Sequence, residues 1–439
     1  MKKNVLKKII EEFQESELPV VIKRRAIDVN PDINKVITIV GPRRVGKTYY
    51  IFSLIKDLLE KGMKKSRIVY INFEDERLLP FTSQDFDAIL EALYELYPEI
   101  RKERIYFFFD EIQEIPLWEK FVRRLYDARK ARIVITGSSS KLTSREIATS
   151  LRGRALSYEL FPFSFEETLR AKGLEINNRL MYSGKRFKVK KFLNEYLEFG
   201  GFPEVVLSKD RNSRLRILNE YLNTIMIRDL VERYNIRNVN ALKTLIKFLV
   251  SNISRSFSLN SYYKMAKQQT PLTKRTLINF VSYLENINLF FFINKFSHSL
   301  KAQMVNRKKV YCIDVGYRTA TGFYTSEDVG WRMENIVFLK LKQREVANPL
   351  IEIFYWRENK KQEVDFLLKE GQKLRQLIQV SYRIDEAQTR KREVEALTTA
   401  MGSLHLSEGL VITEDYEGYE KIKGKKIKFI SLAKWLLEE

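Results

Sequence analysis

One segment of eight residues constrains the fold of this 439-residue chain more than any other stretch does. The segment, Gly41-Pro42-Arg43-Arg44-Val45-Gly46-Lys47-Thr48, fits the pattern G-x-x-x-x-G-K-[ST]. It follows the apolar, β-branched run Val36 to Val40, which predicts a buried strand. Residues 49 to 61 come next and carry apolar side chains at helical spacing. A strand, a glycine-bounded turn and a helix in this order predict the first unit of an α/β fold with a parallel sheet.

The same alternation continues toward residue 160 and predicts further strands of this sheet, with helices between them. The predicted strands are Ile68 to Phe73, Ile105 to Phe109, Ile133 to Thr136 and Leu156 to Leu160. The predicted helices are Asp85 to Leu96, Trp118 to Lys130 and a short amphipathic helix within Met1 to Glu17.

The residue types in the eight-residue segment suit the binding of phosphates. Gly41 and Gly46 let the backbone N–H groups converge on an anion, and the helix that follows directs the positive end of its dipole at the same place. Lys47 supplies a point charge for the β- and γ-phosphates, and the hydroxyl of Thr48 is a hard ligand for Mg²⁺. ATP and Mg²⁺ are therefore the expected cofactors, although no base-reading motif separates ATP from GTP. The predicted nucleotide-binding residues are Gly41, Pro42, Arg43, Arg44, Val45, Gly46, Lys47, Thr48 and Tyr49.

Two acidic residues, Asp110 and Glu111, end the apolar strand that begins at Ile105. We expect Asp110 to hold Mg²⁺ through water, together with Thr48, and Glu111 to orient or deprotonate the attacking water. Ligands of parallel sheets bind at the carboxyl ends of the strands, which is where these two residues lie. The next strand ends in Ser138-Ser139-Ser140, and a hydroxyl there would sense the γ-phosphate.

The loop, the double acid and the hydroxyl-bearing strand end resemble the AAA-type (ASCE) branch of the P-loop ATPases. Other stretches resemble a narrower group, the prokaryotic and archaeal AAA-like ATPases that carry a DUF4143-type C-terminal domain. Those stretches are Gly137 to Leu142, Arg152-Gly153-Arg154, Phe161 to Phe165 and Gly200 to Glu204. The resemblance implies sensor 1 at Ser138 or Ser139, and an arginine finger or sensor arginine at Arg152 or Arg154. It leaves open whether the arginine acts within the subunit or across an interface, and a homo-oligomer is compatible with either.

The middle of the chain is predicted to be helical to about Val250 and then to form a winged helix-turn-helix. Its elements are, in order, a short helix opened by Ser258, a turn at Gln268 to Pro271, a helix at Thr273 to Asn286 and a strand at Leu289 to Ile293. Lys274 and Arg275 lie near the start of the second helix, where a recognition helix would meet a DNA groove. These two residues are therefore the candidate DNA contacts.

The pattern changes again after about Lys301, to a separate α/β domain. The predicted elements are a helix at Trp331 to Gln343, strands at Ile351 to Trp356, Val364 to Leu368 and Leu374 to Val380, a helix at Gln388 to Met401 and a strand at Leu410 to Thr413. The expected domains are residues 1–170 (N-terminal helix and P-loop core), 171–300 (helical lid and winged helix) and 301–439.

The last domain resembles the PD-(D/E)XK nuclease core, which is a restriction-endonuclease-like fold. Glu334 on a helix and Asp365 on a strand match the first two metal-binding carboxylates of that core. The core has a further acid and a lysine on the next strand, where this chain has Gln379 and Ser381. A neutral amide is a poor Mg²⁺ ligand and a serine cannot replace an ammonium, so an inactive nuclease-like domain is predicted.

Lysine and arginine number 78 against 56 aspartate and glutamate residues, which gives a formal net charge of +22. This excess is typical of a surface that binds nucleic acid or anionic membranes, but also of a solvated lysine-rich surface.

The single cysteine, Cys312, excludes an intramolecular disulfide. Charged residues make up 31% of the chain, and cysteine and histidine are scarce; this composition favours a heat-adapted protein. No apolar run approaches the roughly 18 residues that span a bilayer, and no secretory signal is evident, so a cytoplasmic protein without membrane contact is expected.

Two functions are compatible with these features. The first is an Mg²⁺-dependent ATPase, associated with DNA, whose nucleotide state moves the winged helix and the inactive nuclease-like domain. The second is a STAND-like signalling switch that binds protein partners and hydrolyses ATP slowly or not at all. A continuous basic stripe would favour DNA, and scattered charge would favour the switch. The expected members of that stripe are Lys274, Arg275, the cluster Lys185 to Lys191 and the segment Lys301 to Lys309.

Overall fold

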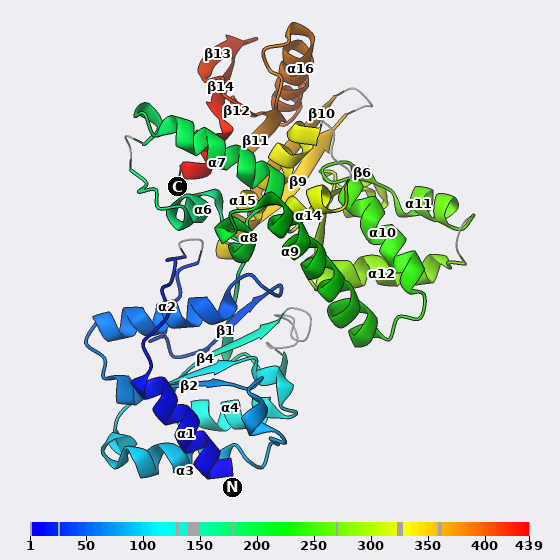
Figure 1. Ribbon diagram of the computed structural model, residues 1–439. Helices are drawn as coiled ribbons and strands as arrows, with labels where there is room; N and C mark the ends of the chain where they lie inside the picture. The colour runs from blue at the N-terminus through cyan, green and yellow to red at the C-terminus, as the bar shows by residue number, and fades with distance from the viewer. Residues whose placement is uncertain are drawn as a thin grey trace. The chain divides into compact units, whose positions relative to one another are not determined.

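The computed structural model describes residues 2–24, 27–128, 131–138, 149–177, 180–268, 271–322, 328–358 and 362–438. The chain forms two compact units, Met1–Phe161 and Pro162–Glu439 (Figure 1). Each unit is described by itself.

The first unit is built on a five-stranded sheet in the order β2-β3-β4-β1-β5, with every pair of neighbours parallel. Its strands are β1 (Val36–Gly41), β2 (Ile68–Asn72), β3 (Ile105–Asp110), β4 (Ala131–Ser138) and β5 (Ala155–Glu159). β1 and β3 are buried along their whole length, as expected for a parallel sheet with both faces covered. The predicted parallel-sheet α/β core is confirmed. β4 lies between β1 and β3, so it separates the glycine-rich loop from the double acid.

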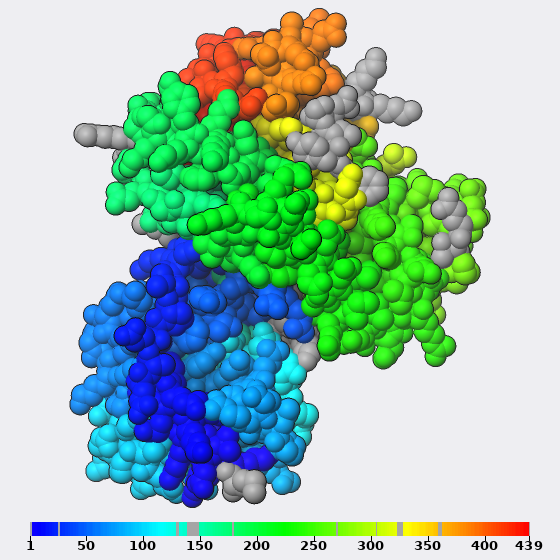
Figure 2. Space-filling model, viewed as in Figure 1, coloured from blue at the N-terminus to red at the C-terminus, as the bar shows by residue number. Residues whose placement is uncertain are grey.

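Four helices cover this sheet: α1 (Lys2–Glu15), α2 (Lys47–Glu60), α3 (Asp87–Leu96) and α4 (Trp118–Asp127). α1, α3 and α4 share one apolar core with alternate residues of β2, β3 and β4, such as Phe107 and Phe109. α2 packs on β1 and β4. α1 buries Leu6, Ile9 and Ile10, while the N-terminal segment, dark blue in Figure 2, lies at the surface of this unit.

The second unit begins with helices and a π-helix. They are α6 (Phe165–Ala171), α7 (Arg186–Phe199), α8 (Pro203–Leu207), α9 (Arg211–Thr224), the π-helix η6 (Ile225–Glu232) and α10 (Val239–Ser251). A capping box at Ser164 and Glu167 starts α6, because each side chain accepts a hydrogen bond from the other residue's backbone N–H.

Among the described residues, three helices and a small sheet follow α10. They are β6 (Ser256–Phe257), α11 (Leu259–Ala266), α12 (Lys274–Asn286), β7 (Phe290–Ile293), α13 (Leu300–Val305) and β8 (Lys308–Cys312). The side chains of Ser258 and Thr273 cap α11 and α12 at their N-termini. β8 pairs antiparallel with both β6 and β7, in the order β6-β8-β7. β8 therefore joins the segment after residue 301 to the elements that precede it.

The C-terminal part of this unit contains a six-stranded mixed sheet in the order β13-β14-β12-β11-β10-β9. Its elements are α14 (Gly316–Ala320), α15 (Val329–Ala347), β9 (Ile351–Arg357), β10 (Glu363–Glu370), β11 (Lys373–Ser381), α16 (Ala387–Ser403), β12 (Glu408–Thr413), β13 (Gly418–Ile422), β14 (Lys425–Ser431) and α17 (Leu432–Leu437). α16 packs on β10, β11 and β12, and α15 packs on β8, β9 and β11. The predicted α/β character of this part is confirmed.

Among the residues described, no helix combines the length and apolar character that crossing a membrane requires.

Candidate active site

The glycine-rich loop connects β1 to α2 at the carboxyl edge of the first sheet. Gly46 caps α2 with φ 91°, a left-handed conformation that glycine adopts without strain. A buried arginine lies behind the loop: Arg24 donates to the carbonyl oxygens of Val45 (3.0 Å) and Phe161 (2.6 Å). These two hydrogen bonds tie the loop to the end of the sheet.

The side chain of Lys47 is buried and folds back onto its own loop. Its Nζ donates to the carbonyl oxygens of Gly41 (3.3 Å) and Pro42 (3.2 Å). The same Nζ lies 3.7 Å from Oε1 of Glu111, so the structure brings the predicted phosphate-binding lysine and the predicted catalytic carboxylate together. A phosphate that reached Lys47 would replace carbonyl oxygens with a charged acceptor, which forms stronger hydrogen bonds.

Asp110 is fully buried at the end of β3 and is surrounded by hydroxyl groups. Its Oδ2 accepts from Thr48 (2.7 Å) and Tyr70 (3.1 Å), and its Oδ1 accepts from Thr136. Burial raises the pKa of Asp110, and the hydrogen bonds from Thr136 and Thr48 oppose that rise. The two predicted metal ligands, Thr48 and Asp110, thus lie in direct contact.

Thr136 and Tyr70 were missed by the sequence reasoning. Thr136 lies on β4, one residue beyond the Phe109↔Ile135 pair, and its Oγ1 also accepts from the backbone N–H of Glu111 (3.0 Å). One hydroxyl therefore holds both acids, including Glu111, whose backbone is left-handed (φ 49°). Thr136 could have been noticed as a polar residue near the end of an otherwise apolar strand. Its contact with Asp110 and Glu111 could not be predicted, because the sequence does not show that β4 lies beside β3.

Two further carboxylates, Glu74 and Glu114, lie close to Glu111. Carboxylate oxygens of the three residues approach within 4.8 Å of one another. Burial raises the pKa of Glu74, and the neighbouring charges of Glu111 and Glu114 raise it further. The negative potential of these carboxylates favours a cation beside Glu111, and the ammonium of Lys47 lies there.

The candidate sensor residues lie in two different places. The backbone of Ser138 pairs with Gly41 at the end of β4, next to the loop, whereas Ser139 lies outside the described residues. The guanidinium of Arg154 donates to Asp127 (3.0 Å), and its carbonyl oxygen accepts from the backbone N–H of Val36, the first residue of β1. Arg154 is therefore at the amino end of the sheet, opposite the loop. A role for Arg154 at its own nucleotide is not supported, and a role across an interface stays a prediction.

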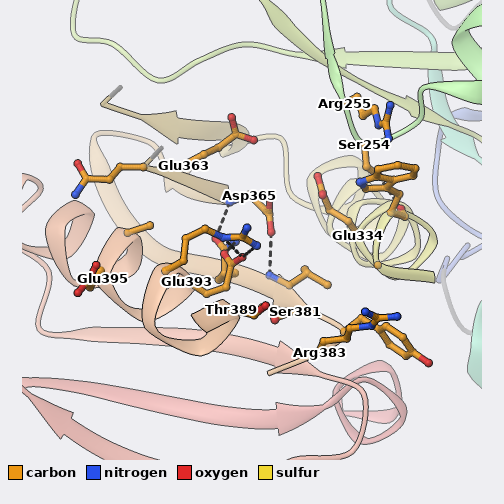
Figure 3. Close-up of a pocket in the computed structure, with 18 of the residues that line it drawn as sticks. Ser254, Arg255, Glu334, Glu363, Asp365, Ser381, Arg383, Thr389, Glu393 and Glu395 are labelled. Carbon is orange, nitrogen blue, oxygen red and sulfur yellow. Dashed lines mark hydrogen bonds and ion pairs between the residues drawn. The ribbon is translucent and has the colours of Figure 1, made fainter. Parts of the chain in front are cut away.

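The four residues compared with a nuclease core lie around one cavity of the second unit, with a volume of about 1420 Å³ (Figure 3). Glu334 comes from α15, Asp365 from β10, and Gln379 and Ser381 from β11. The backbone N–H groups of Asp365 and Val380 donate, respectively, to Oε1 of Gln379 (3.2 Å) and Oδ2 of Asp365 (2.9 Å). These bonds hold the side chains of β10 and β11 in register.

Lys309 ends the segment that a basic stripe would include if the charge were arranged to favour DNA. It is 2% exposed on β8, so it does not contribute to a surface stripe, and its Nζ lies 2.7 Å from Glu334, 2.9 Å from Asp365 and 3.1 Å from Glu363. Pairing of β8 with both β6 and β7 turns the side chain inward. Burial alone would lower the pKa of Lys309, but the carboxylates of Asp365 and Glu334 outweigh it and hold that pKa well above its ordinary value.

Glu393 was also missed, because it comes from α16 and not from the strand on which an acid was sought. Its Oε2 accepts from the amide of Gln379 (2.5 Å). Burial raises its pKa, and burial raises the pKa of Glu334 to about 8. The cluster thus contains an ammonium from β8 and an extra carboxyl from α16, both supplied by elements that the sequence comparison did not connect.

Three family models match parts of this chain. The model of an AAA domain matches residues 33–169, and two models of domains of unknown function, DUF8612 and DUF4143, match residues 190–327 and 329–435. The uncharacterized protein MJ1544 of Methanocaldococcus jannaschii is 37% identical over 430 residues, which are 95% of this chain and 92% of that protein. The chain belongs to the MJ1544 family. An uncharacterized protein of Haemophilus influenzae is 29% identical over 412 residues, covering 93% of this chain and 95% of its own length.

Among solved structures, the Walker-type ATPase PABY2304 of Pyrococcus abyssi is similar to this chain. The two are 15% identical with a TM-score of 0.40, over 73% of this chain and 95% of that chain. The family models, and not this structural likeness, show that the chain contains an AAA-type P-loop domain and a C-terminal DUF4143 domain.

Proposed function

We propose that this protein binds and hydrolyses ATP with Mg²⁺ and that it associates with DNA. The observation that carries the enzymatic part is the convergence of Lys47, Thr48, Asp110 and Glu111 at the carboxyl edge of the first sheet. The hydroxyl of Thr48 and the carboxylate of Asp110 are hard oxygen donors, which are the ligands that Mg²⁺ prefers. The donor set therefore fits the ion.

Each residue of this site has a separate role in the proposed reaction. The loop amides and Lys47 bind and orient the phosphates, and Glu111 orients the attacking water and accepts its proton. Thr136 is a positioning residue, because it holds the side chain of Asp110 and the backbone of Glu111. Bound Mg²⁺ supplies neutralisation of the phosphate charge.

The first test concerns nucleotide binding. Lys47→Ala is expected to abolish binding of a fluorescent ATP analogue, because the buried ammonium proposed to contact the β- and γ-phosphates is removed. Lys56→Ala, on the exposed side of the same helix, is the matched control and should bind as the wild type does. Equal binding by both variants would refute the site.

The DNA association is supported by the net charge of +22 and by the order of elements around α12. α11, α12, β7 and β8 follow the order of a winged helix-turn-helix, and Lys274 and Arg275 are exposed first residues of α12. The double variant Lys274→Ala, Arg275→Ala is expected to lower the salt dependence of duplex binding by about two units of slope. An unchanged slope would exclude this helix as the contact.

The signalling switch remains the second candidate. Two observations argue against a continuous basic stripe on the surface, and so favour the switch over DNA association. Lys309 is buried, and Lys190, from the cluster Lys185 to Lys191, is paired with Asp415 on the surface. In the first candidate, the proposed nucleotide state is coupled to movement of the winged-helix segment and the nuclease-like domain; in the second, it governs binding of protein partners. Turnover without DNA, and its response to DNA, separate the two: a rate that DNA does not change favours the switch.

A further inference from the structure

The ammonium of Lys309 occupies the centre of an acidic cluster in the second unit. An ammonium has three N–H donors, and three carboxylate oxygens, from Glu334, Asp365 and Glu363, lie within 3.1 Å of it. The remaining oxygen of Asp365 accepts from the backbone of Val380, and Oε1 of Glu334 also accepts from Tyr311 (2.7 Å). Each of the three carboxyl groups in this cluster therefore contacts at least one donor from the chain itself.

A side chain thus provides the positive charge that clustered carboxylates otherwise draw from a metal ion. A divalent ion between Glu334 and Asp365 would have to displace a buried ammonium that both residues contact at hydrogen-bond distance. Within the described part of the chain, three acidic side chains lie close enough together to share one metal ion. They are Glu74, Glu111 and Glu114, and they belong to the first unit. The cavity above Lys309 is accordingly built to work without a divalent metal.

The lining of this cavity has a basic rim. Of the lining residues, Arg255, Arg383, Lys391 and Arg392 are exposed cations and Glu395 is an exposed acid. Arg383 also lies 3.3 Å from Glu386, and Arg392 lies 2.6 Å from Glu393. Figure 3 shows Arg255 and Arg383 among the residues that line it, together with the acids of the floor.

Two helices also begin at the cavity. α15 contributes Gly330 and Trp331 from its first turn, and α16 contributes Gln388 and Thr389 from its first turn. Helix N-termini carry partial positive charge and free N–H groups, which add to the attraction that the rim exerts on an anion.

Two groups in the cavity could contact a nucleobase, one by hydrogen bonds and one by stacking. The carboxylate of Glu363 is 29% exposed; Lys309 lies 3.1 Å from its Oε1 and Arg357 lies 3.3 Å from its Oε2, and its remaining lone pairs can accept from the exocyclic amino group of a base. The guanidinium of Arg255 lies over the indole of Trp331, 3.5 Å from the ring centroid, and such planar groups stack on unpaired bases. A volume of about 1420 Å³ exceeds the size of ordinary small-molecule pockets, which favours a segment of polymer.

We propose that this cavity binds a single strand of nucleic acid without a divalent metal, with its phosphates on the basic rim and a base directed toward the floor. This inference rests on the DNA association given under the proposed function. It locates a binding site for a single strand in the cavity, and not at α12. Duplex DNA is a weaker ligand, because its paired bases present no free face to the guanidinium of Arg255.

The test measures fluorescence anisotropy of a labelled single strand of mixed sequence, about 15 nucleotides long, with the full-length protein. Binding is expected to be as tight in EDTA as in Mg²⁺. The double variant Arg383→Glu, Arg392→Glu is expected to weaken it about tenfold or more, since two phosphate contacts become repulsive. The variant Arg211→Glu, Arg216→Glu changes the net charge equally on the exposed side of α9 and should bind as the wild type does.

Three results would overturn the proposal. They are binding that EDTA abolishes, equal weakening by the α9 variant, and loss of binding only in the variant Lys274→Glu, Arg275→Glu. The last result would leave the DNA association of the proposed function intact and move it to α12. Absence of single-strand binding would likewise refute the cavity as a binding site, and it would leave duplex binding at α12 to its own test. ATP hydrolysis, measured on the same preparation, would report on the first unit independently.

Discussion

At the scale of single residues, both candidate sites depend on side chains that come from strands other than the expected ones: β4 beside β3 in the first unit, and β8 of a separate sheet in the second. Asp110 and Glu111 were predicted from one apolar strand, but Thr136 on β4 holds them both. Glu334 and Asp365 were predicted from a resemblance, but Lys309 on β8 neutralises them. A motif identifies residues that are close in sequence, whereas these partners are brought close only by the order of strands.

Thr136→Val is expected to lower kcat about 10- to 100-fold with little change in KM, since residues that hold a metal-binding carboxylate affect activity on that scale. The variant leaves Asp110 and the backbone N–H of Glu111 without a shared hydroxyl. Steady-state hydrolysis measures the effect. Thr136→Ser keeps the hydroxyl and should restore most of the rate, and a Val variant with wild-type kcat would contradict the positioning role.

Lys309→Met is expected to convert the acidic cluster into a metal site, because three carboxylates lose the cation between them. Without metal the variant should unfold at a lower temperature than the wild type. With Mn²⁺ its Tm should rise by more than the Tm of the wild type does. Thermal unfolding with and without Mn²⁺ measures this difference, and equal Mn²⁺ effects on the two proteins would show that the ammonium does not stand in for a cation.

At the scale of helices and strands, elements with strong apolar patterns were predicted close to their observed bounds. β3, predicted at Ile105 to Phe109, spans Ile105–Asp110, and α12, predicted at Thr273 to Asn286, spans Lys274–Asn286 with Thr273 as its cap. β13 was not predicted, because it lies at the edge of its sheet and alternates between half-buried and exposed residues. Such a strand is stabilised by pairing with β14, and not by an apolar run that a sequence would display.

The link between the glycine-rich turn at residue 200 and α14 is made by one buried carboxyl group. Asp314 accepts from the backbone N–H groups of Gly201 and Gly316, each at 2.7 Å. Burial raises its pKa to about 7, from 3.8 in an unfolded chain. The folded state therefore retains a proton that the unfolded chain releases, so this group's contribution to stability is fully present below pH 3.8 and is lost as pH rises through about 7.

Asp314→Asn should remove this dependence. The free energy of unfolding of the wild type is expected to fall between pH 3.8 and about 7 more steeply than that of the variant. The difference in slope should approach about 1.4 kcal/mol per pH unit, the value for one proton. Urea denaturation at several pH values gives both slopes, and parallel curves would show that Asp314 is ionised in the folded protein.

At the scale of the whole molecule, the chain joins an AAA-type P-loop unit to a unit that contains the DUF4143 domain. The presence of a P-loop core could be predicted from eight residues, because the loop, its strand and its helix are contiguous. The candidate site in the second unit could be predicted only in part. Its cavity takes residues from β6, β8, α15, β10, β11 and α16, and no contiguous motif specifies such a set.

Steady-state ATP hydrolysis by the wild type and by Glu111→Gln, with Mg²⁺ or EDTA, tests the central claim most directly. The wild type is expected to turn over ATP only with Mg²⁺, and Glu111→Gln is expected to bind the nucleotide but to lose turnover, since an amide cannot accept the proton of the attacking water. Hydrolysis that persists unchanged in Glu111→Gln, or that does not need Mg²⁺, would contradict the assignment of this chain as an ATPase that uses Asp110 and Glu111.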